Sequence, residues 1–274
     1  MPEQEIYMNK ETTAFSTTLS IRISTDGFCF CTYDPSRPES VRYSHYECDA
    51  SQTLAANFGA AWEKYGLAGQ QFASTQVIVA TTEFTVVPGE YDRKEDYGQL
   101  FGCCFDMGNR EVKVLANRMS AQDMTVLFAV DEELYSRVCE TGNVCFYSTA
   151  SILLGFLARY PRSEERYMLA CYHGTKSFLV AMDGERPALM NSLGAESADD
   201  HLFYLLSILS ELGFSQESDA LLLCGDAAAD AMQMAVSRFV RNVERVNPRE
   251  LFRSNLLNKI ENIPFDLQVL ILCE

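Results

Sequence analysis

The sequence has few basic residues and no long apolar run. Lysine and arginine number 22 against 38 aspartates and glutamates, so the net charge is −16. Such a surface repels phosphate backbones and anionic lipid, which disfavours binding of nucleic acid. The most apolar runs, at 220–224 and 269–273, are far shorter than the ~20 residues of a membrane-spanning helix. We therefore expect no nucleic-acid partner and no direct insertion into a membrane.

Sequence signatures of several protein classes are also missing. Residues 1–5, Met-Pro-Glu-Gln-Glu, lack the basic and apolar regions of a secretory signal, so we expect a cytoplasmic protein. The chain has no Gly-x-Ser-x-Gly elbow, no Walker lysine loop and no His-Glu-x-x-His motif. No catalytic residue is predicted. The content of 47% hydrophobic and 22% charged residues is typical of a soluble globular protein.

The ten cysteines do not form a metal-binding pattern. No Cys-x-x-Cys pair occurs, and the three histidines are scattered through the chain, so no metal ligand is predicted. Most cysteines lie in apolar strand-like runs such as 28–31 and 221–224. A buried, reduced cysteine behaves as a small hydrophobic residue. We therefore predict free thiols in the core, as is usual in the cytosol.

The chain repeats one order of elements. In the first half, Leu19, Ile21 and Ile23 alternate with polar residues, which predicts a strand with one buried face. Asp26-Gly27 predicts a hairpin turn, since both residues tolerate positive φ. The further elements expected in this half are strands at 28–33, 41–46 and 76–80 and a helix at 51–65. The corresponding elements of the second half are strands at 167–172, 176–182, 188–192 and 219–224, a helix capped by Ser197, and a helix at 227–240.

Polar segments divide this pattern into two predicted domains, 1–160 and 161–274. The first contains an inserted segment near 89–120, which is rich in Tyr, Asp, Gly and Asn and has one strand at 112–116. We expect the acid-rich part of this segment, 90–97, to be a solvated loop, although paired carboxylates there could bind a cation. The stretch from 121 to 160 is expected to form strands at 125–130 and 144–147 and helices at 132–140 and 150–159.

Two copies of an antiparallel meander, a helix and a parallel strand resemble the actin-like ATPase fold. That α/β fold has two ribonuclease-H-like halves whose mixed sheets face a cleft. Residues 126–131, 142–144, the helix expected after 148, and residues 166–194 and 243–248 are similar to segments of its pilus-assembly and type II secretion members. Most of 15–274 also resembles DUF3822, a family of Bacteroides-type proteins of unknown function.

The resemblance implies a nucleotide site made of three turns. In working members, backbone N–H groups of two hairpins hold the phosphates, and an acidic residue holds magnesium through water. A third turn, with two adjacent glycines, contacts adenosine. The candidate residues for ATP with magnesium are Asp26, Gly27, Gly174, Thr175, Lys176, Gly225 and Asp226.

These turns depart from the family pattern. Phe28 and Cys29 replace hydroxyl residues after the first turn, and the second turn lacks its acidic residue. Asp226 stands where the second glycine is expected, where it would repel phosphate. Each turn also has a plain structural reading: a hairpin at 26–27, a solvated turn at 174–176, and a helix cap at Asp226.

Three functions remain open from the sequence. The first is a non-catalytic scaffold or adaptor that binds a protein partner and has a degenerate nucleotide site, a pseudo-ATPase. The second is an ATP-binding enzyme, an ATPase or small-molecule kinase with unusual cleft residues. The third is an unrelated α/β protein in which the repeat is accidental. Homo-oligomerisation is open in each case, and we expect no nucleotide turnover.

Overall fold

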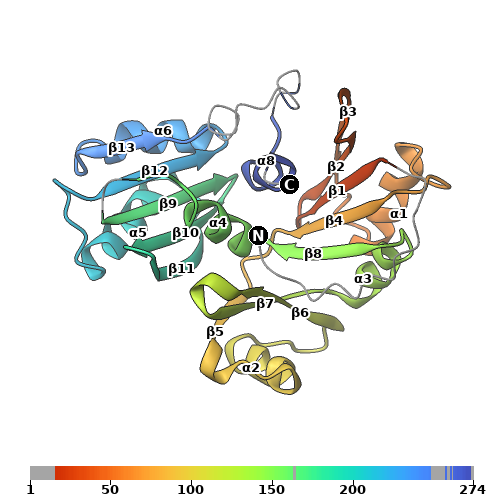
Figure 1. The fold of residues 1–274 in the computed structure, drawn as a ribbon, viewed down its shortest axis with the longest axis horizontal. Helices are drawn as coiled ribbons and strands as arrows, with labels where there is room; N and C mark the ends of the chain where they lie inside the picture. Colours follow the sequence, from red (N-terminus) through yellow and green to blue (C-terminus); the bar gives the residue numbers. More distant parts are fainter. Residues whose placement is uncertain (1–15, 163–164, 248–256, 258–259, 261, 273–274) are drawn as a thin grey trace. The chain divides into compact units, whose positions relative to one another are not determined.

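The computed structural model describes residues 16–162, 165–247, 257, 260 and 262–272. These residues form two compact units (Figure 1). The first unit contains the described residues up to Thr149, with 257 and 260, and the second contains the remainder. Each unit has its own five-stranded sheet. The domain boundary suggested by the sequence, between residues 160 and 161, stays a prediction.

The main sheet of the first unit has the strand order β3-β2-β1-β4-β8. Strands β1, β2 and β3 form an antiparallel meander, and β4 and β8 continue the sheet parallel to β1. The bounds are β1 Thr18–Ile23, β2 Gly27–Asp34, β3 Arg37–Glu47, β4 Ser74–Val79 and β8 Val144–Ser148. The strands predicted from the hydrophobic pattern are confirmed.

β1 is buried along its whole length, which corrects the prediction of one buried face. Its polar side chains Ser20 and Arg22 are 0% and 3% exposed. The Ser20 hydroxyl donates to Oε1 of Gln76 on neighbouring β4, at 3.5 Å. A central strand can be covered on both faces, and polar side chains are buried there when they find partners. The alternation therefore indicated the strand but not its exposure.

Helix α1, Leu54–Lys64, packs an aromatic cluster onto this sheet. It begins at Thr53, whose side chain accepts the N–H of Ala56 at 3.1 Å. Phe58 lies edge-on to Phe28, and Trp62, the only tryptophan of the chain, stacks on Phe58; both pairs have ring centroids 5.5 Å apart. Such pairs add roughly 0.5–1.5 kcal/mol each beyond area burial. The helix predicted here is confirmed.

Between β4 and β8 the chain forms a separate antiparallel sheet in the order β5-β7-β6. The elements of this segment are β5 Phe84–Pro88, α2 Tyr97–Cys104, β6 Val112–Met119, β7 Met124–Asp131 and α3 Glu132–Cys139. Helix α2 places Phe101, which is fully buried, against Val87 and Leu127. The sequence predicted β6, β7 and α3 but missed β5 and α2.

The acid-rich stretch 90–97 is not simply a solvated loop. The Asp92 carboxylate accepts the hydroxyl of Tyr97 and, at 2.8 Å, that of Thr125. It also forms an ion pair with Arg118 at 3.3 Å. Burial, together with the bond to Asp92, raises the pKa of Tyr97 to about 12, so its hydroxyl remains a donor at neutral pH. Asp92 therefore ties this stretch to β6 and β7, and the solvated-loop prediction is wrong at that residue.

The sheet of the second unit has the order β11-β10-β9-β12-β13, which repeats the first sheet position by position. Strands β9, β10 and β11 form the meander, and β12 and β13 run parallel to β9. The bounds are β9 Arg166–His173, β10 Lys176–Asp183, β11 Arg186–Gly194, β12 Ala220–Gly225 and β13 Asn242–Arg245. The common order confirms the predicted repeat and excludes an accidental one.

Helices α5, Ala198–Glu211, and α6, Ala227–Val236, pack against one core with β9, β10 and β12. Ser197 caps α5 as predicted, accepting the N–H of Asp200 at 3.1 Å. Helix α6 is shorter than predicted. It ends at Val236 and is followed by a turn, in which the N–H groups of Phe239 and Val240 both donate to the Val236 carbonyl, at 2.8 and 2.9 Å.

Two further helices belong to the described residues, α4 at Thr149–Leu157 and α8 at Phe265–Leu272. The prediction of α4 is confirmed, whereas α8 was seen in the sequence only as a short apolar run. None of the helices in the described ranges combines the length and apolarity that crossing a bilayer requires. Pro248, the last residue of the segment 243–248 that resembles pilus-assembly members, lies outside the described residues.

The cysteines are free thiols at the nine described positions, but not all of them are in the core. Cys29, Cys31 and Cys171 are buried as predicted, and burial raises the pKa of Cys31 to about 12. Cys103 and Cys104, on α2, are exposed, so the core prediction is wrong for these two. Helix α2 was not predicted, and its exposed end therefore could not be recognised.

We expect a thiol reagent to modify Cys103 and Cys104 in a fast phase, since reagent access and thiolate formation both favour exposed sites. Replacing both with serine should remove this phase, while Cys171→Ser should leave it intact. Absorbance after mixing with an aromatic disulfide reagent measures this fast phase and the slower reaction of the buried thiols. In denaturant without reductant all ten thiols should react, and a smaller number would contradict the free-thiol prediction.

Asp34, at the end of β2, is held by several donors. Its carboxylate accepts the hydroxyl and N–H of Ser36 at 2.6 and 3.0 Å and the Ser16 hydroxyl at 2.8 Å, and it pairs with Arg37 at 2.9 Å. These bonds, chiefly those from Ser36, hold the pKa of Asp34 well below its usual value. A carboxyl whose pKa is lowered on folding stabilises the fold above its unfolded pKa of about 3.9, and this contribution disappears as pH falls through the folded pKa.

Asp34→Asn should therefore lower the urea midpoint of unfolding at neutral pH. The difference in midpoint between variant and wild type should become smaller as pH falls below about 4. Asp183→Asn, at the corresponding exposed turn of the second unit, is the matched control and should change the midpoint little. If the difference in midpoint between Asp34→Asn and wild type stays constant with pH, the carboxylate charge is not what stabilises the turn.

Candidate functional site

Three turns carry the residues that the sequence predicts as a nucleotide site. The first turn lies between β1 and β2 in the first unit, and the other two lie at the β9–β10 hairpin and after β12 in the second unit. The residues concerned are Asp26 and Gly27 in the first unit, and Gly174, Thr175, Lys176, Gly225 and Asp226 in the second.

The first turn is a tight hairpin. The N–H of Ser24 donates to the Gly27 carbonyl at 3.0 Å, the N–H of Gly27 returns to the Ser24 carbonyl at 3.4 Å, and the Ser24 hydroxyl adds a bond of 2.9 Å. A side chain at Gly27 would collide with the carbonyl oxygen of Tyr46 on β3. The predicted hairpin is confirmed, but the turn needs glycine for another reason than the positive φ that the sequence analysis assumed. Glycine is needed for this close approach, since neither Asp26 nor Gly27 has positive φ.

In the second unit the β9–β10 hairpin and the end of β12 are bonded together. The N–H of Asp226 donates to the Tyr172 carbonyl at 3.1 Å, and the N–H of Gly174 donates to Oδ2 of Asp226 at 2.6 Å. Gly225 has φ +106°, and a Cβ there would overlap the carbonyl of Tyr172. Only glycine allows two backbones to approach in this way. The structure thus brings Gly174, Gly225 and Asp226 together.

The other oxygen of Asp226 begins helix α6. Oδ1 accepts the N–H of Ala228 at 2.9 Å, which is the capping role that the plain structural reading predicted. One carboxylate therefore joins the N–H of a hairpin to the N-terminus of a helix. Both are places where an anion is favoured, and here the chain itself supplies the negative charge.

Thr175 and Lys176 complete the hairpin next to Gly174. The Thr175 carbonyl accepts the N–H of Ala195 at 2.9 Å, which ties the turn to the end of β11. Lys176 is the first residue of β10 and lies opposite His173 in the register. Within the described part of the chain, no three His, Cys, Asp or Glu side chains are grouped to hold a metal ion. Nucleotide contacts at the seven predicted residues stay predictions.

The sequence analysis did not recognise a contact between two buried rings next to this hairpin. Tyr172 lies edge-on to His201, the ring centroids being 5.4 Å apart, and Nδ1 of His201 is 3.4 Å from the Ser177 hydroxyl. Nε2 of His201 is buried and finds no partner among the described residues. Burial lowers the pKa of His201, although the charges of Asp200 and Asp226 act in the opposite sense.

A sequence signal for His201 did exist. Residues four apart lie on one face of a helix, and His201 precedes the buried Leu205 and Leu209 at that spacing. It therefore belongs to the apolar stripe of α5. A desolvated imidazole of this kind is neutral at pH 7, so His201 adds no positive charge beside Asp226.

Comparison with solved structures identifies the fold. A Bacteroides thetaiotaomicron protein described as having an actin-like ATPase fold and unknown function matches with a TM-score of 0.80 and 24% identity, over 97% of this chain and 100% of that one. A chain of the PilM–PilN type IV pilus biogenesis complex matches with a TM-score of 0.59 and 13% identity, over 94% and 98%. The predicted α/β, actin-like ATPase fold is confirmed.

The family is shown by the sequence itself. A family model described as "Protein of unknown function (DUF3822)" matches residues 7–243, which is most of the chain. No curated protein matches this chain. The resemblance to this family and to the pilus-assembly fold is thus confirmed, and the chain belongs to the DUF3822 family of proteins of unknown function.

Proposed function

We propose that the protein is a non-catalytic actin-like scaffold or adaptor that binds a protein partner. One observation carries the proposal: the Asp226 carboxylate accepts the N–H groups of Gly174 and Ala228, at 2.6 and 2.9 Å. The resemblance to nucleotide-binding members assigns the hairpin N–H groups to phosphate. In this chain the carboxylate of Asp226 accepts the N–H of Gly174 instead.

The charge at the turns of the second unit supports this proposal. A phosphate oxygen near Gly174 would meet the Asp226 carboxylate, and two like charges about 4 Å apart repel by roughly 1 kcal/mol in water and about 4 kcal/mol near a protein surface. Moving the carboxylate away would remove the cap of α6, which costs about 1 kcal/mol. The close contact at Gly225 also fixes the backbone that carries Asp226.

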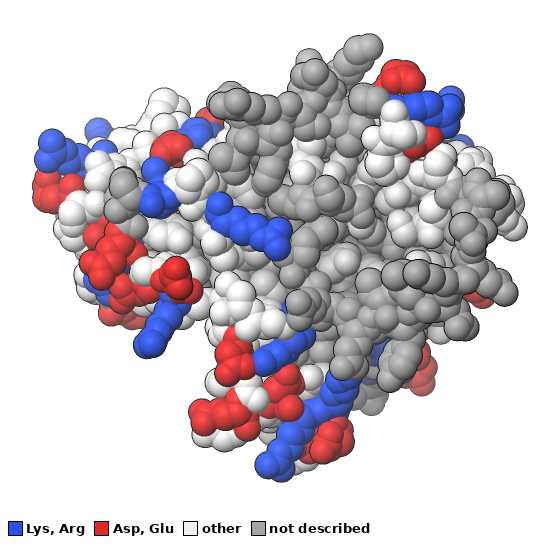
Figure 2. All heavy atoms as spheres, viewed as in Figure 1, with Lys and Arg blue, Asp and Glu red and all other residues white. Residues whose placement is uncertain are grey.

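A protein partner is supported by the fold and by the surface. The PilM–PilN complex shows that a chain of similar fold takes part in a protein assembly. Among the described residues on the face drawn in Figure 2, acidic and basic side chains are mixed and are separated by uncharged areas. A mixed surface of this kind suits a protein better than a nucleic acid, which needs concentrated positive charge.

Calorimetry with magnesium-ATP and a phosphate-release assay test the proposal. Wild type should give no saturable heat, and its phosphate release should equal that of Asp26→Ala, at background. Asp226→Ser keeps a capping residue on α6 but removes the charge and releases the Gly174 N–H, so we expect it to bind ATP more strongly than wild type. Asp199→Ser, which removes an exposed acid from the first turn of α5, is the matched control and should behave as wild type.

The alternative left open by the sequence has a distinct outcome. Turnover by wild type that disappears in Asp26→Ala would establish an ATP-binding enzyme and refute the scaffold. Saturable binding of ATP by wild type, unchanged in Asp226→Ser, would show that the carboxylate does not occupy a phosphate position.

A further inference from the structure

Two neighbouring thiols are exposed at the end of helix α2. Cys103 and Cys104 are the last two residues of this helix, and both side chains are exposed. The other seven described cysteines are buried or half-buried. The Cys104 thiol contacts the Thr85 hydroxyl at 3.6 Å, which is a weak bond because sulfur is a poor donor. Both thiols are therefore within reach of small molecules in solution.

The helical backbone prevents these two thiols from bonding to each other. Adjacent residues of an α-helix are rotated by about 100° around its axis, and their side chains do not face each other. A disulfide needs its two Cβ atoms about 3.8 Å apart, with a fixed dihedral angle at the S–S bond. A bond between Cys103 and Cys104 therefore requires that the backbone leaves the helical conformation at this turn.

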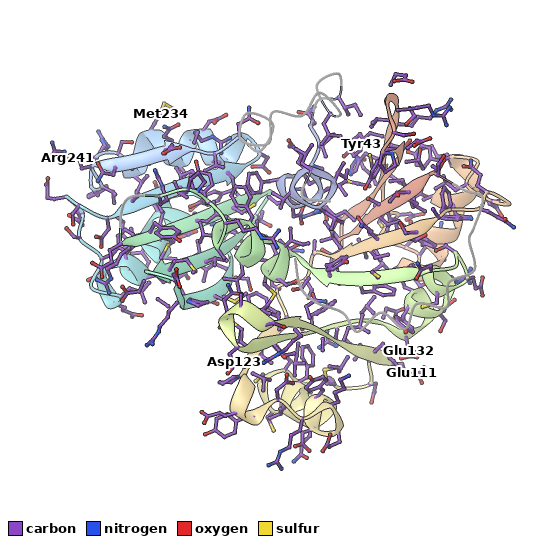
Figure 3. The ribbon with its side chains drawn as sticks, in the orientation of Figure 1. Tyr43, Glu111, Asp123, Glu132, Met234 and Arg241 are labelled. Atoms are coloured by element: carbon purple, nitrogen blue, oxygen red, sulfur yellow. The ribbon has the colours of Figure 1, made fainter. Side chains whose placement is uncertain are left out.

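The last turn of α2 is held by few interactions. It contains Gly102, which weakens the helix, and it is closed by the bond from the Phe105 N–H to the Phe101 carbonyl at 3.0 Å. Among the described backbone bonds after α2, the first one to another element is at Glu111, whose carbonyl accepts the N–H of Glu132 at 3.0 Å. Figure 3 shows these two residues together where β6 begins and β7 ends. The turn can thus open without breaking the ladder between β6 and β7.

We propose that Cys103 and Cys104 form a reversible oxidation site that reacts with low-molecular-weight disulfides and whose oxidation opens the last turn of α2. One of the two thiolates attacks a sulfur of the small disulfide. The S–S bond of that molecule breaks, a mixed disulfide forms and one small thiol leaves. The neighbouring thiolate then attacks the protein sulfur of the mixed disulfide, which forms the Cys103–Cys104 bond and releases the second small thiol. The protein loses two electrons and two protons, and the small disulfide takes up both.

Oxidation of the pair and formation of the helix should oppose each other, because only the dithiol is compatible with the helical turn. Such a coupling is reciprocal. Gly102→Ala should favour the helix, since nothing lies within 4 Å of the new Cβ, and should shift the equilibrium about fivefold toward the dithiol. Gly59→Ala, on α1, is the matched control: its Cβ makes an ordinary contact of 3.5 Å with Arg137, and the equilibrium should not change.

Equilibration of the reduced full chain with glutathione and oxidised glutathione at a series of ratios tests the proposal. Acid quenching, thiol blocking and tryptic digestion follow. Lys94 and Arg110 flank the pair, so one tryptic peptide, 95–110, contains both thiols. Mass spectrometry should show this peptide with two blocked thiols at reducing ratios, and two hydrogens lighter without blocking groups at oxidising ratios. Cys103→Ser cannot complete the second step and should retain one glutathione instead.

Hydrogen exchange tests the opening of the helix. The Phe105 amide should lose protection when wild type is oxidised, because its bond to Phe101 is broken, whereas the amides of α1 should not change. In the variant with serine at both 103 and 104, the glutathione ratio should have no effect on this amide. The proposal is overturned by a wild-type peptide that retains glutathione or stays reduced at the most oxidising ratio. It is also overturned by a Phe105 amide that does not respond, or by equal shifts in Gly102→Ala and Gly59→Ala.

Discussion

An alanine at position 225 should destabilise the second unit by about 3–5 kcal/mol, the largest effect that we expect of any single substitution here. A residue with a side chain is strained by roughly 1–3 kcal/mol at a φ of this kind, and the shift needed to remove an overlap costs a similar amount. Both penalties apply at Gly225, which has φ +106° and lies against the Tyr172 carbonyl. Hydrogen exchange of the β9 and β12 amides in wild type and variant measures the loss of stability.

A second glycine separates the two causes. Gly213, after α5, has φ +63°, but nothing lies within 4 Å of the position that its Cβ would take. Gly213→Ala should therefore cost only the left-handed penalty of about 1–2 kcal/mol. If Gly225→Ala and Gly213→Ala lose equal stability, the close approach of β9 and β12 adds nothing to the cost of the strained backbone conformation.

Asn117→Ala should destabilise the first unit by about 2–5 kcal/mol. Asn117, on β6, is fully buried, and its amide completes the outer edge of β8. Nδ2 donates to the Phe146 carbonyl at 2.8 Å, and Oδ1 accepts the N–H of Ser148 at 2.9 Å. Without the amide both backbone groups lose this partner in the interior, and each such loss costs about 1–3 kcal/mol. Urea unfolding followed by far-UV circular dichroism measures the change.

Asn191→Ala is the matched control for this prediction. Asn191 is an exposed asparagine on strand β11, and its Oδ1 accepts only the neighbouring N–H of Ser192 at 2.8 Å in the described bonds. Its removal should change stability by less than about 0.5 kcal/mol, as is usual at the surface. If Asn117→Ala is as mild as this control, the edge of β8 does not depend on the amide.

The main sheets could be predicted from the sequence because their strands are apolar runs separated by strong turns. The segment between β4 and β8 could not. Helix α2 contains Gly98 and Gly102 in eight residues, and each glycine lowers helix stability by about 1 kcal/mol relative to alanine. It forms because Phe101 packs into a core made with Val87 and Leu127. Strand β5 is only five residues long and ends in proline, which gives too weak a pattern to recognise.

The candidate site could be predicted in part for a similar reason. The capping role of Asp226 is local, since an aspartate directly before an alanine-rich segment favours the start of a helix. Its bond to Gly174 joins residues 52 positions apart. That bond depends on the register in which Tyr172 of β9 lies opposite Gly225 of β12. No sequence pattern at either turn specifies this register.

The single tryptophan makes the two units separately observable. Trp62 stacks on Phe58 in the first unit, and the second unit contains no tryptophan. Selectively excited fluorescence therefore follows the unfolding of the first unit alone, whereas peptide absorption in circular dichroism follows both. Asn117→Ala should move the fluorescence transition, while Gly225→Ala should leave it in place and change only the remaining signal. The chain thus carries an intrinsic optical label that assigns each substitution to the unit in which it acts.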